Sequence, residues 1–205
     1  EPWLAVANMD LRDGLGKIFL AAPLNPKDLV HLVKETENIS WDTRKGGLIA
    51  LRQMKIGNIV LQSKPLSAVS EEDALNIICE AIRAEGDKLL DLTGDFEQLQ
   101  NRILSLCVWN PEENWPDVNT KVLLENNKEW LGPYLKDTRT LADLKKLDVA
   151  EALLSFLSWD KQQSLEKLAP KKIEVPSGSK IPLQYFANGA TPVLAVRLQE
   201  VFGLA

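Results

Sequence analysis

The sequence predicts an α+β protein, in which a small antiparallel β-module precedes a mainly helical domain closed by a C-terminal β-hairpin and helix. Up to about residue 65, short alternating apolar runs are separated by glycine-containing turns, which is typical of strands. Between residues 70 and 168, apolar residues instead recur at spacings of three and four, which indicates amphipathic helices. After Pro170 the alternating pattern returns. With 205 residues, 45% of them hydrophobic, the chain can build a packed core.

The β-module begins with a hairpin, because the strand-like runs 3–8 and 17–22 are joined by a polar turn with two glycines. A short helix should follow to about Glu35, since Asn25 and Pro26 form a helix start. Three further strands are then expected, at residues 39–43, 48–55 and 58–64. The pattern describes a short meander with one helix.

The composition changes at residues 65–70, so we predict two domains, 1–69 and 70–205. Ser70 and Asp73 form a capping box that starts the first helix of the second domain. Apolar stripes then predict a series of helices that Pro170 ends, at residues 74–82, 96–107, 118–131, 140–147, 149–157 and 159–168.

The last thirty residues predict a hairpin and a helix that pack on the helical domain. Runs 173–176 and 180–186 flank the Ser177-Gly-Ser179 turn. Thr191 suits an N-cap with Pro192 at the first helical position, and Gly203 stands where a C-cap belongs.

Charge is unevenly distributed along the chain, whose net charge is −5. Residues 1–69 carry nine Lys and Arg against seven Asp and Glu, residues 70–169 eleven against twenty, and residues 170–205 four against two. Because a polyanion is bound by clustered Lys and Arg, we expect any nucleic-acid contact at the two ends of the chain. The candidate contacts are Lys17, Arg52, Lys55, Lys180 and Arg197.

No signal segment or run of about 18 apolar residues is present, so we expect a cytoplasmic protein without membrane contact. The missing initiator Met, with a strand-like run from Trp3, predicts a fragment of a longer polypeptide. Cys79 and Cys107 both follow the apolar pattern of helices, which favours buried thiols over a disulfide.

No catalytic or metal-binding constellation is found. Gly14-Leu-Gly16-Lys17 lacks the first glycine and the following Ser or Thr of a phosphate-binding loop, since Leu11 and Ile18 stand there. Ser177-Gly-Ser-Lys180 matches the Ser-x-x-Lys pattern of a hydrolase but lies between strands and has no Ser-Asp-Asn partner. His31, the only histidine, is expected at the surface.

Two residue types leave alternatives open. The six tryptophans are spread along the chain, which favours core and interdomain packing over base stacking. Arg197 suits either a buried ion pair with an acidic residue of the helical domain or a contact with RNA or a partner.

Several segments together resemble the bacterial HrpB family of DExH-box ATP-dependent helicases. The C-terminal signature is carried by Pro176-Ser-Gly-Ser179 and Pro192-Val-Leu-Ala-Val-Arg-Leu-Gln-Glu-Val-Phe-Gly-Leu204. The family's oligonucleotide-binding-like region is similar to Pro2-Trp-Leu-Ala-Val-Ala7 and Leu20-Ala-Ala-Pro-Leu24. Its helical segment is similar to Trp115-Pro-Asp117, Trp130-Leu-Gly-Pro-Tyr134 and Leu147-Asp-Val-Ala-Glu-Ala-Leu153.

The resemblance implies that residues 1–69 form a partial oligonucleotide-binding-like (OB-like) module and residues 70–205 the family's C-terminal domain. Walker A, Asp-Glu-x-His and arginine-finger motifs are missing, so the chain itself is not expected to bind ATP or to catalyse a reaction. ATP and Mg are implied for the motor domains of a parent helicase. Those motor domains and RNA or single-stranded nucleic acid are the implied partners. A protein-interaction module that docks a partner through the acidic helical domain is the alternative.

Overall fold

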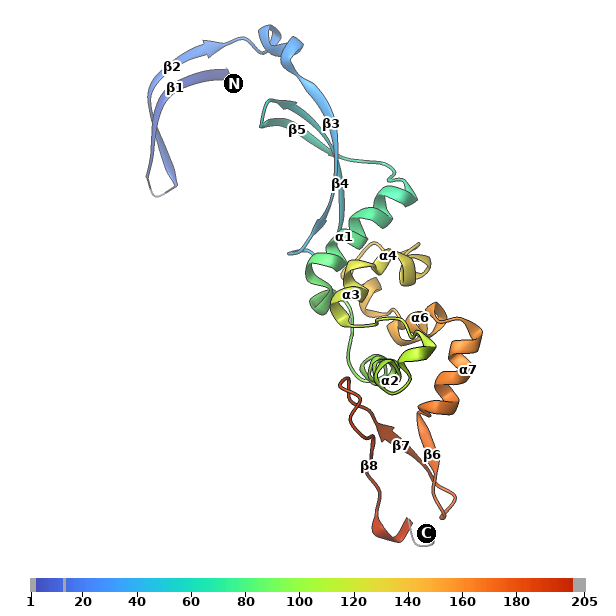
Figure 1. The fold of residues 1–205 in the computed structure, drawn as a ribbon. Coiled ribbons are helices and arrows are strands. Elements are labelled where there is room, and N and C mark those ends of the chain that lie inside the picture. Colours follow the sequence, from blue (N-terminus) through green and yellow to red (C-terminus); the bar gives the residue numbers. More distant parts are fainter. Residues whose placement is uncertain (1–2, 13, 201–205) are drawn as a thin grey trace. The chain divides into compact units, whose positions relative to one another are not determined.

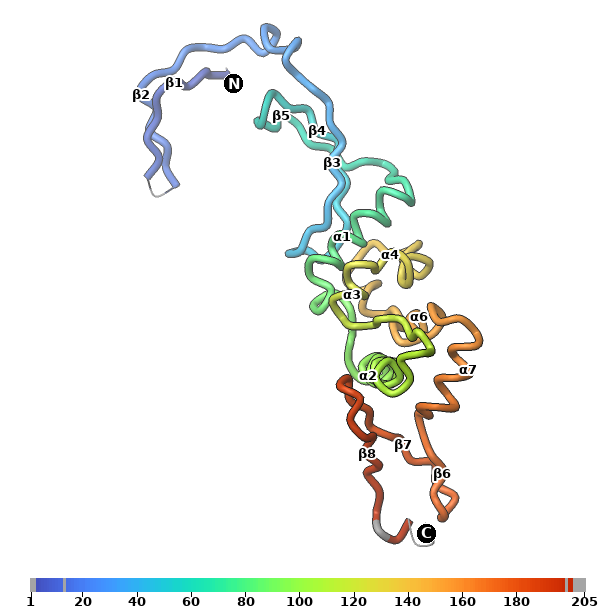
Figure 2. The backbone as a smooth tube through the Cα atoms, in the orientation of Figure 1, coloured from blue at the N-terminus to red at the C-terminus, as the bar shows by residue number. Residues whose placement is uncertain are grey.

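The computed structural model describes residues 3–12 and 14–200, and confirms a mixed α+β protein with small antiparallel sheets (Figures 1 and 2). Its contacts divide the chain into two compact units. The first holds the residues up to Ile39 and Ile49–Ala68, and the second holds Ser40–Leu48 and the residues from Val69 onward. The predicted division at residue 69 would place residues 40–48 in the first unit, whereas their contacts place them in the second. No local feature of the sequence indicates this.

The first unit is built from strands and one 3₁₀ helix. Strand β1 pairs with β2, with a bulge near Asn8, and a separate sheet has the order β3-β4-β5. In chain order the elements are β1 (Trp3–Arg12), β2 (Leu15–Leu24), 3₁₀ helix η1 (Pro26–Leu32), β3 (Lys34–Asp42), β4 (Gly47–Ile56) and β5 (Ile59–Pro65). The turn between β3 and β4, with the adjoining ends of both strands, belongs to the second unit.

The predicted first hairpin and meander are confirmed, with longer strands than expected. The short helix does begin at Pro26, where the Asn25 side chain accepts a hydrogen bond from the Lys27 N–H. It ends at Leu32 and not near Glu35, because Lys34 already begins β3. His31 is exposed, as expected. The OB-like character of this unit stays a prediction.

The second unit is mainly helical, and its helices gather around one core (Figure 1). Its helices, in chain order, are α1 (Glu71–Leu89), α2 (Asp95–Trp109), η2 (Pro111–Glu113), α3 (Thr120–Glu125), α4 (Asn127–Trp130), η3 (Gly132–Tyr134), α5 (Leu141–Lys145), α6 (Val149–Phe156) and α7 (Trp159–Leu168). Ser70 caps α1 by accepting from the Asp73 N–H, as the capping box predicts. Thr140 and Asp143 form a full capping box on α5.

One predicted helix, 118–131, is wrong as a single element. It is divided into α3 and α4 at Asn126, whose backbone leaves the helical region. The neighbouring Asn127 is fully buried, and its amide donates to the carbonyls of Cys79 and Leu124. An Asn side chain that bonds main-chain carbonyls competes with the regular helix, which explains the break.

The core contains two of the six tryptophans, Trp115 and Trp130, and Phe96 packs on Trp130 at 6.1 Å between ring centroids. Trp41 is half-buried against the same core, whereas Trp159 is 71% exposed. Packing therefore accounts for some of the tryptophans and not for all. Cys79 is buried, Cys107 is half-buried, and the two thiols are not joined.

The turn between β3 and β4 is part of the second unit. The Leu141 N–H donates to the Gly46 carbonyl and the Leu48 N–H donates to the Arg139 carbonyl, both at 2.8 Å. Gly46 has φ +66°, and an added Cβ would lie 2.9 Å from Cβ of Leu141. This close approach requires glycine.

The C-terminal segment forms a three-stranded sheet of β6 (Lys172–Glu174), β7 (Lys180–Gln184) and β8 (Val193–Leu194), followed by the 3₁₀ helix η4 (Leu198–Glu200). The hairpin 173–186 is confirmed. The helix does not begin at Pro192 as predicted, because Val193 and Leu194 pair with β7, and helical backbone follows only in η4. β-branched and apolar residues fit an edge strand as readily as a short helix. The rest of that predicted helix, with its C-cap Gly203, lies outside the described residues.

In the described part of the chain, no helix has the length and apolar character needed to cross a membrane.

Candidate functional site: a polar cleft beside α2

Helix α2 carries the largest set of buried polar side chains in the described structure. Gln100, Asn101, Arg102 and Ser105 are all buried, between the apolar residues Phe96, Leu99, Ile103, Leu104 and Leu106. A helix that is apolar on several sides is enclosed by other elements, so its polar side chains must find partners inside the protein.

One polar stripe of α2 binds the extended chain that follows β7. These side chains are three or four positions apart and therefore lie on one face of the helix. The hydrogen bonds run from the Tyr185 N–H to Gln98 Oε1 (3.0 Å), from Asn101 Nδ2 to the Tyr185 carbonyl (3.1 Å), from Ser105 Oγ to the Phe186 carbonyl (3.0 Å) and from Trp109 Nε1 to the Gly189 carbonyl (2.7 Å). We call residues 185–189 the clasp. It fixes the C-terminal sheet to the helical core.

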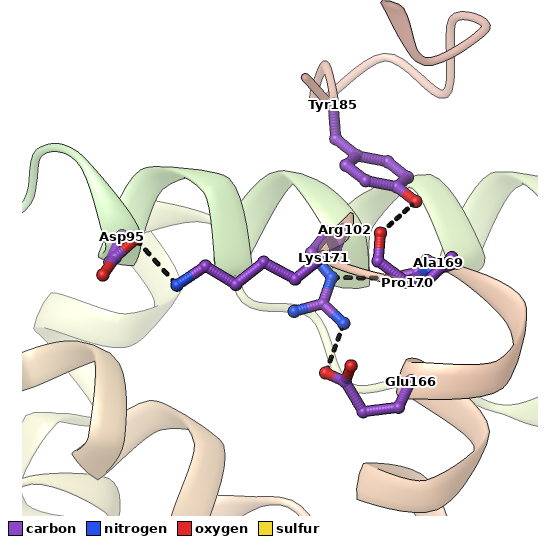
Figure 3. A network of polar contacts seen from close by, with 7 residues as sticks. All are labelled: Asp95, Arg102, Glu166, Ala169, Pro170, Lys171 and Tyr185. Atoms are coloured by element: carbon purple, nitrogen blue, oxygen red, sulfur yellow. Dashed lines mark hydrogen bonds and ion pairs between the residues drawn. The ribbon is translucent and has the colours of Figure 1, made fainter. Parts of the chain in front are cut away.

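Arg102 is the centre of a second network, seen in Figure 3. Its residue surface is 4% exposed, its Nε donates to the Ala169 carbonyl at 2.6 Å, and one terminal nitrogen, Nη2, lies 2.5 Å from Oε1 of Glu166. Tyr185 joins the network by donating its hydroxyl to the Pro170 carbonyl at 2.8 Å. Burial raises the pKa of this hydroxyl, and nearby Arg102 partly opposes the shift.

Arg102 and Glu166 border a cleft of about 230 Å³ between the first half of α2 and α6. Its apolar lining consists of Leu99, Ala150 and Leu154. Its charged lining consists of the carboxylates Asp95, Asp148, Glu151 and Glu166 and of two cations, Arg102 and Lys171. Lys171 Nζ lies 3.0 Å from Oδ1 of Asp95 (Figure 3).

The lining of the cleft offers a ligand charged and apolar groups. It contains no histidine, cysteine, serine or threonine. Across the described residues, no group of three His, Cys, Asp or Glu side chains is arranged to hold a metal ion. Hydrogen bonding, ion pairing and apolar contact are what its lining offers a ligand.

The five predicted nucleic-acid contacts lie elsewhere. Lys17 is on β2, with its ammonium 5.3 Å from the Phe19 ring centroid. Arg52 on β4 lies 3.3 Å from Glu35 and 3.2 Å from Glu37, so its charge is compensated.

The other three are on different elements. Lys55 is half-buried on β4, next to a register shift after Met54. Lys180 is exposed on β7, where its register partner is Glu174, and Arg197 is exposed after β8. The buried ion pair considered for Arg197 is wrong, since the residue is exposed. The role of all five residues in binding stays a prediction.

Sequence reasoning missed Arg102 and the cleft. The available signal was the apolar character of α2 on all sides of Arg102, which requires this arginine to be enclosed. Its partners could not be found in the same way, because Glu166 and Ala169 are more than sixty positions away.

Two family models match the chain. The model described as ATP-dependent helicase C-terminal matches residues 130–205, and the model described as ATP-dependent RNA helicase HrpB, connector region, matches residues 32–66. Among curated proteins, the chain is similar to the ATP-dependent RNA helicase HrpB of Escherichia coli (strain K12), with 36% identity over 193 residues. The match covers 92% of this chain and 24% of that protein.

Two solved structures are similar over 98% of this chain and 26% of theirs, each with a TM-score of 0.66. One is the crystal structure of the Escherichia coli DEAH/RHA helicase HrpB, at 32% identity, and the other that of the E. coli DExH-box NTPase HrpB, at 34%. The chain thus spans about a quarter of the length of the relatives that it matches.

Proposed function

We propose that this chain, which matches the connector and C-terminal regions of HrpB-type helicases, is a non-catalytic accessory part of an ATP-dependent RNA or DNA helicase. In this role it supports nucleic-acid binding and braces the motor domains. The observation that carries the proposal is the similarity to E. coli HrpB, which covers 92% of this chain at 36% identity.

The similarity suggests separate roles for this chain and for the motor domains of the parent helicase. Motor domains elsewhere in the parent polypeptide bind ATP and Mg and hydrolyse the nucleotide. The second unit supplies a rigid body, because α2 ties together the helices and the C-terminal sheet through the clasp. A cytoplasmic location in a bacterial cell is part of the same proposal.

Nucleic acid is contacted by the basic side chains Lys17, Arg52, Lys55, Lys180 and Arg197. Their Lys and Arg side chains can pair with phosphates, and phosphate contacts release counterions. Arg52 must exchange Glu35 and Glu37 for phosphate, so its contribution is the smallest of the exposed cations.

The test is made in the full-length parent helicase. All five residues are changed to Ala, and the Kd for single-stranded RNA and the RNA-stimulated ATPase rate are measured at several salt concentrations. A matched variant replaces Lys121, Lys146 and Lys167, which are exposed on the acidic helical unit. We expect the first variant to bind at least about ten-fold more weakly with a shallower salt dependence. Equal affinity in the wild type and both variants would contradict the nucleic-acid role.

A second candidate function is a protein-interaction module. It is supported by the excess of carboxylates in residues 70–169 and by the acidic cleft beside α2. Affinity capture with this 205-residue chain, followed by nuclease treatment, tests it: a stoichiometric protein that stays bound supports the module, and capture that depends on nucleic acid contradicts it.

A further inference from the structure

The sheet with the order β3-β4-β5 carries charged side chains on all three of its strands. We propose that Arg52 on β4 and Lys64 on β5 together bind the phosphodiester backbone of a nucleic acid. Glu35 and Glu37 on β3 restrict this binding, because they compete with phosphate for Arg52. The inference rests on the nucleic-acid role in the proposed function. It adds Lys64 as a contact and gives the two carboxylates an opposing effect.

Arg52 and Lys64 lie directly opposite each other in the antiparallel pair of β4 and β5. Residues in such positions point to the same face of a sheet, with Cβ atoms about 4.5–5.5 Å apart. Both residues are exposed. Two like charges that face each other in this way destabilise a strand pair. A local conflict of this kind is typical of positions that serve a function, and an anion bound between the two cations would relieve it.

The protein itself compensates only one of the two cations. Oε1 of Glu35 lies 3.3 Å from Nε of Arg52, and Oε1 of Glu37 lies 3.2 Å from Nη2 of Arg52. Lys64 forms no ion pair within the described residues. Because β4 is the central strand, the carboxylates come from one neighbouring strand and the ammonium group from the other. The positive charge of Lys64 is therefore available to a ligand.

Phosphate competes with the carboxylates for the same edge of the guanidinium. Nε and Nη2 of Arg52 form the edge that binds a phosphate through two parallel hydrogen bonds, and both nitrogens now face carboxylates. The two ion pairs are exposed, and such pairs contribute little to stability, so a ligand can displace them. A nucleic acid gains from the exchange because each phosphate contact releases counterions. Lys64 holds the same phosphate or the next one.

The experiment measures the binding of a fluorescein-labelled oligouridylate to the full-length parent helicase, by fluorescence anisotropy at several salt concentrations. The glutamine variant combines Glu35→Gln and Glu37→Gln, which keep the shape of both side chains and remove their charges. A matched control combines Glu97→Gln and Glu129→Gln, at two exposed positions of the second unit. The control changes the net charge by the same amount, so it separates a local effect from a general one.

We expect the glutamine variant to bind at least about three-fold more tightly than the wild type, with a steeper salt dependence, because Arg52 gains a phosphate contact. The matched control should bind as the wild type does. In an Arg52→Ala background the two glutamine substitutions should leave the affinity unchanged, since the cation for which the carboxylates compete is missing.

Lys64→Ala should bind about three-fold more weakly and with a shallower salt dependence. Lys121→Ala, which removes an exposed lysine of the second unit, should change neither quantity. An oligouridylate with uncharged methylphosphonate linkages should bind the wild type and the glutamine variant alike, because the contact is made with phosphate charge and not with bases.

The inference would be overturned by wild-type affinity in the glutamine variant or in Lys64→Ala, by an equal gain in the matched control, or by a gain that persists in the Arg52→Ala background. Weaker binding by the glutamine variant would also overturn it, since the carboxylates would then be contacts themselves. A methylphosphonate strand that binds the glutamine variant more tightly would assign the contact to bases and contradict the proposal.

Failure of this site and failure of the proposed nucleic-acid role are distinguishable. If the variant with all five candidate residues changed to Ala binds RNA as the wild type does, the nucleic-acid role fails and this site fails with it. If that variant binds more weakly while the glutamine variant and Lys64→Ala both keep wild-type affinity, the role stands and this site is wrong.

Discussion

The two units of this protein differ most in how much they bury. Every buried residue of the described chain lies in the second unit, from Ala74 onward, whereas the strands of the first unit carry exposed Leu, Ile, Met and Phe side chains. Leu15 is 79% exposed and Leu11 68%, while Ile78, Ile103, Leu144 and Leu165 are 0% exposed. The helical unit therefore has the core that stabilises a fold, and the β-module has only its hydrogen-bonded ladders.

This difference explains where a binding site can be precise. A side chain is held in one orientation when its neighbours are packed, as the Arg102 side chain on α2 is held against Glu166 and Ala169 at the end of α7. On the exposed strands, Lys17 and Arg52 have no such enclosure. Matched changes in the two units should therefore have unequal effects.

The largest effect is expected for a phenylalanine in each unit. Phe96→Ala removes a ring that is 2% exposed and packs on Trp130, so it should lower the free energy of unfolding by about 3–5 kcal/mol. Phe19→Ala, where the ring is 57% exposed, should cost less than about 1 kcal/mol. Urea unfolding followed by far-UV circular dichroism measures both, and equal losses would show that the β-module has a core of its own.

The next largest difference in unfolding free energy is expected between substitutions of two arginines, one in each unit. Arg102→Met leaves the buried Ala169 carbonyl without its donor and should cost about 2–3 kcal/mol in the same urea experiment. Arg52→Met breaks only the exposed pairs with Glu35 and Glu37, which is worth at most about 1 kcal/mol. A larger loss for Arg52 would reverse the comparison.

Within the second unit, the clasp can be tested through two glycines with positive φ. An added Cβ at Gly189 would lie 2.8 Å from the Val108 side chain, whereas at Gly178 it meets nothing within 4 Å. Gly178→Ala should therefore cost only the left-handed backbone strain, about 1 kcal/mol, and Gly189→Ala about 2 kcal/mol. The Tm of each variant is measured by calorimetry, and identical shifts would mean that the clasp is not packed against α2.

The smallest expected effect is on the dependence of stability on pH, through the carboxylate of Asp143. Bonds from the Thr140 hydroxyl, and then from the N–H groups of Arg139 and Thr140, lower the pKa of Asp143. A carboxyl whose folded-state pKa lies below its unfolded value stabilises the fold above about pH 4, and this stabilisation is lost as the pH falls through the folded value.

Asp143→Asn should thus reduce the urea midpoint near neutral pH and make it less dependent on pH below about 4. Thr140→Val, which removes the largest cause of the shift, should act in the same direction. An unchanged acid slope in both variants would show that this capping box does not contribute.

Local signals predicted most of the helical unit. The cap at Ser70 and the bounds of α7 follow from residues within a few positions of each other. The C-terminal strand was missed because Pro192 and the apolar run after it also suit a helix start, and pairing with Leu183 and Gln184 decides between the two. Such pairing is not encoded locally.

Long-range contacts also explain what the sequence could not show about the site. The tip of the β3–β4 hairpin joins the helical unit through Arg139 and Leu141, nearly a hundred positions away. Arg102 could be recognised as enclosed, but its partners and the carboxylates that line the cleft come together only when α2, α6 and α7 pack. The sequence predicted the elements, and tertiary packing built the cleft.

Hydrogen–deuterium exchange of the 205-residue chain, read by mass spectrometry, tests the central contrast most directly. Amides of α2 and α6 should exchange slowest, at the rate of global unfolding, because their helices are enclosed by the core. Amides of β1 and β2 should exchange orders of magnitude faster, since a hairpin with exposed side chains opens on its own. Equal protection of the β1–β2 hairpin and α2 would contradict the account.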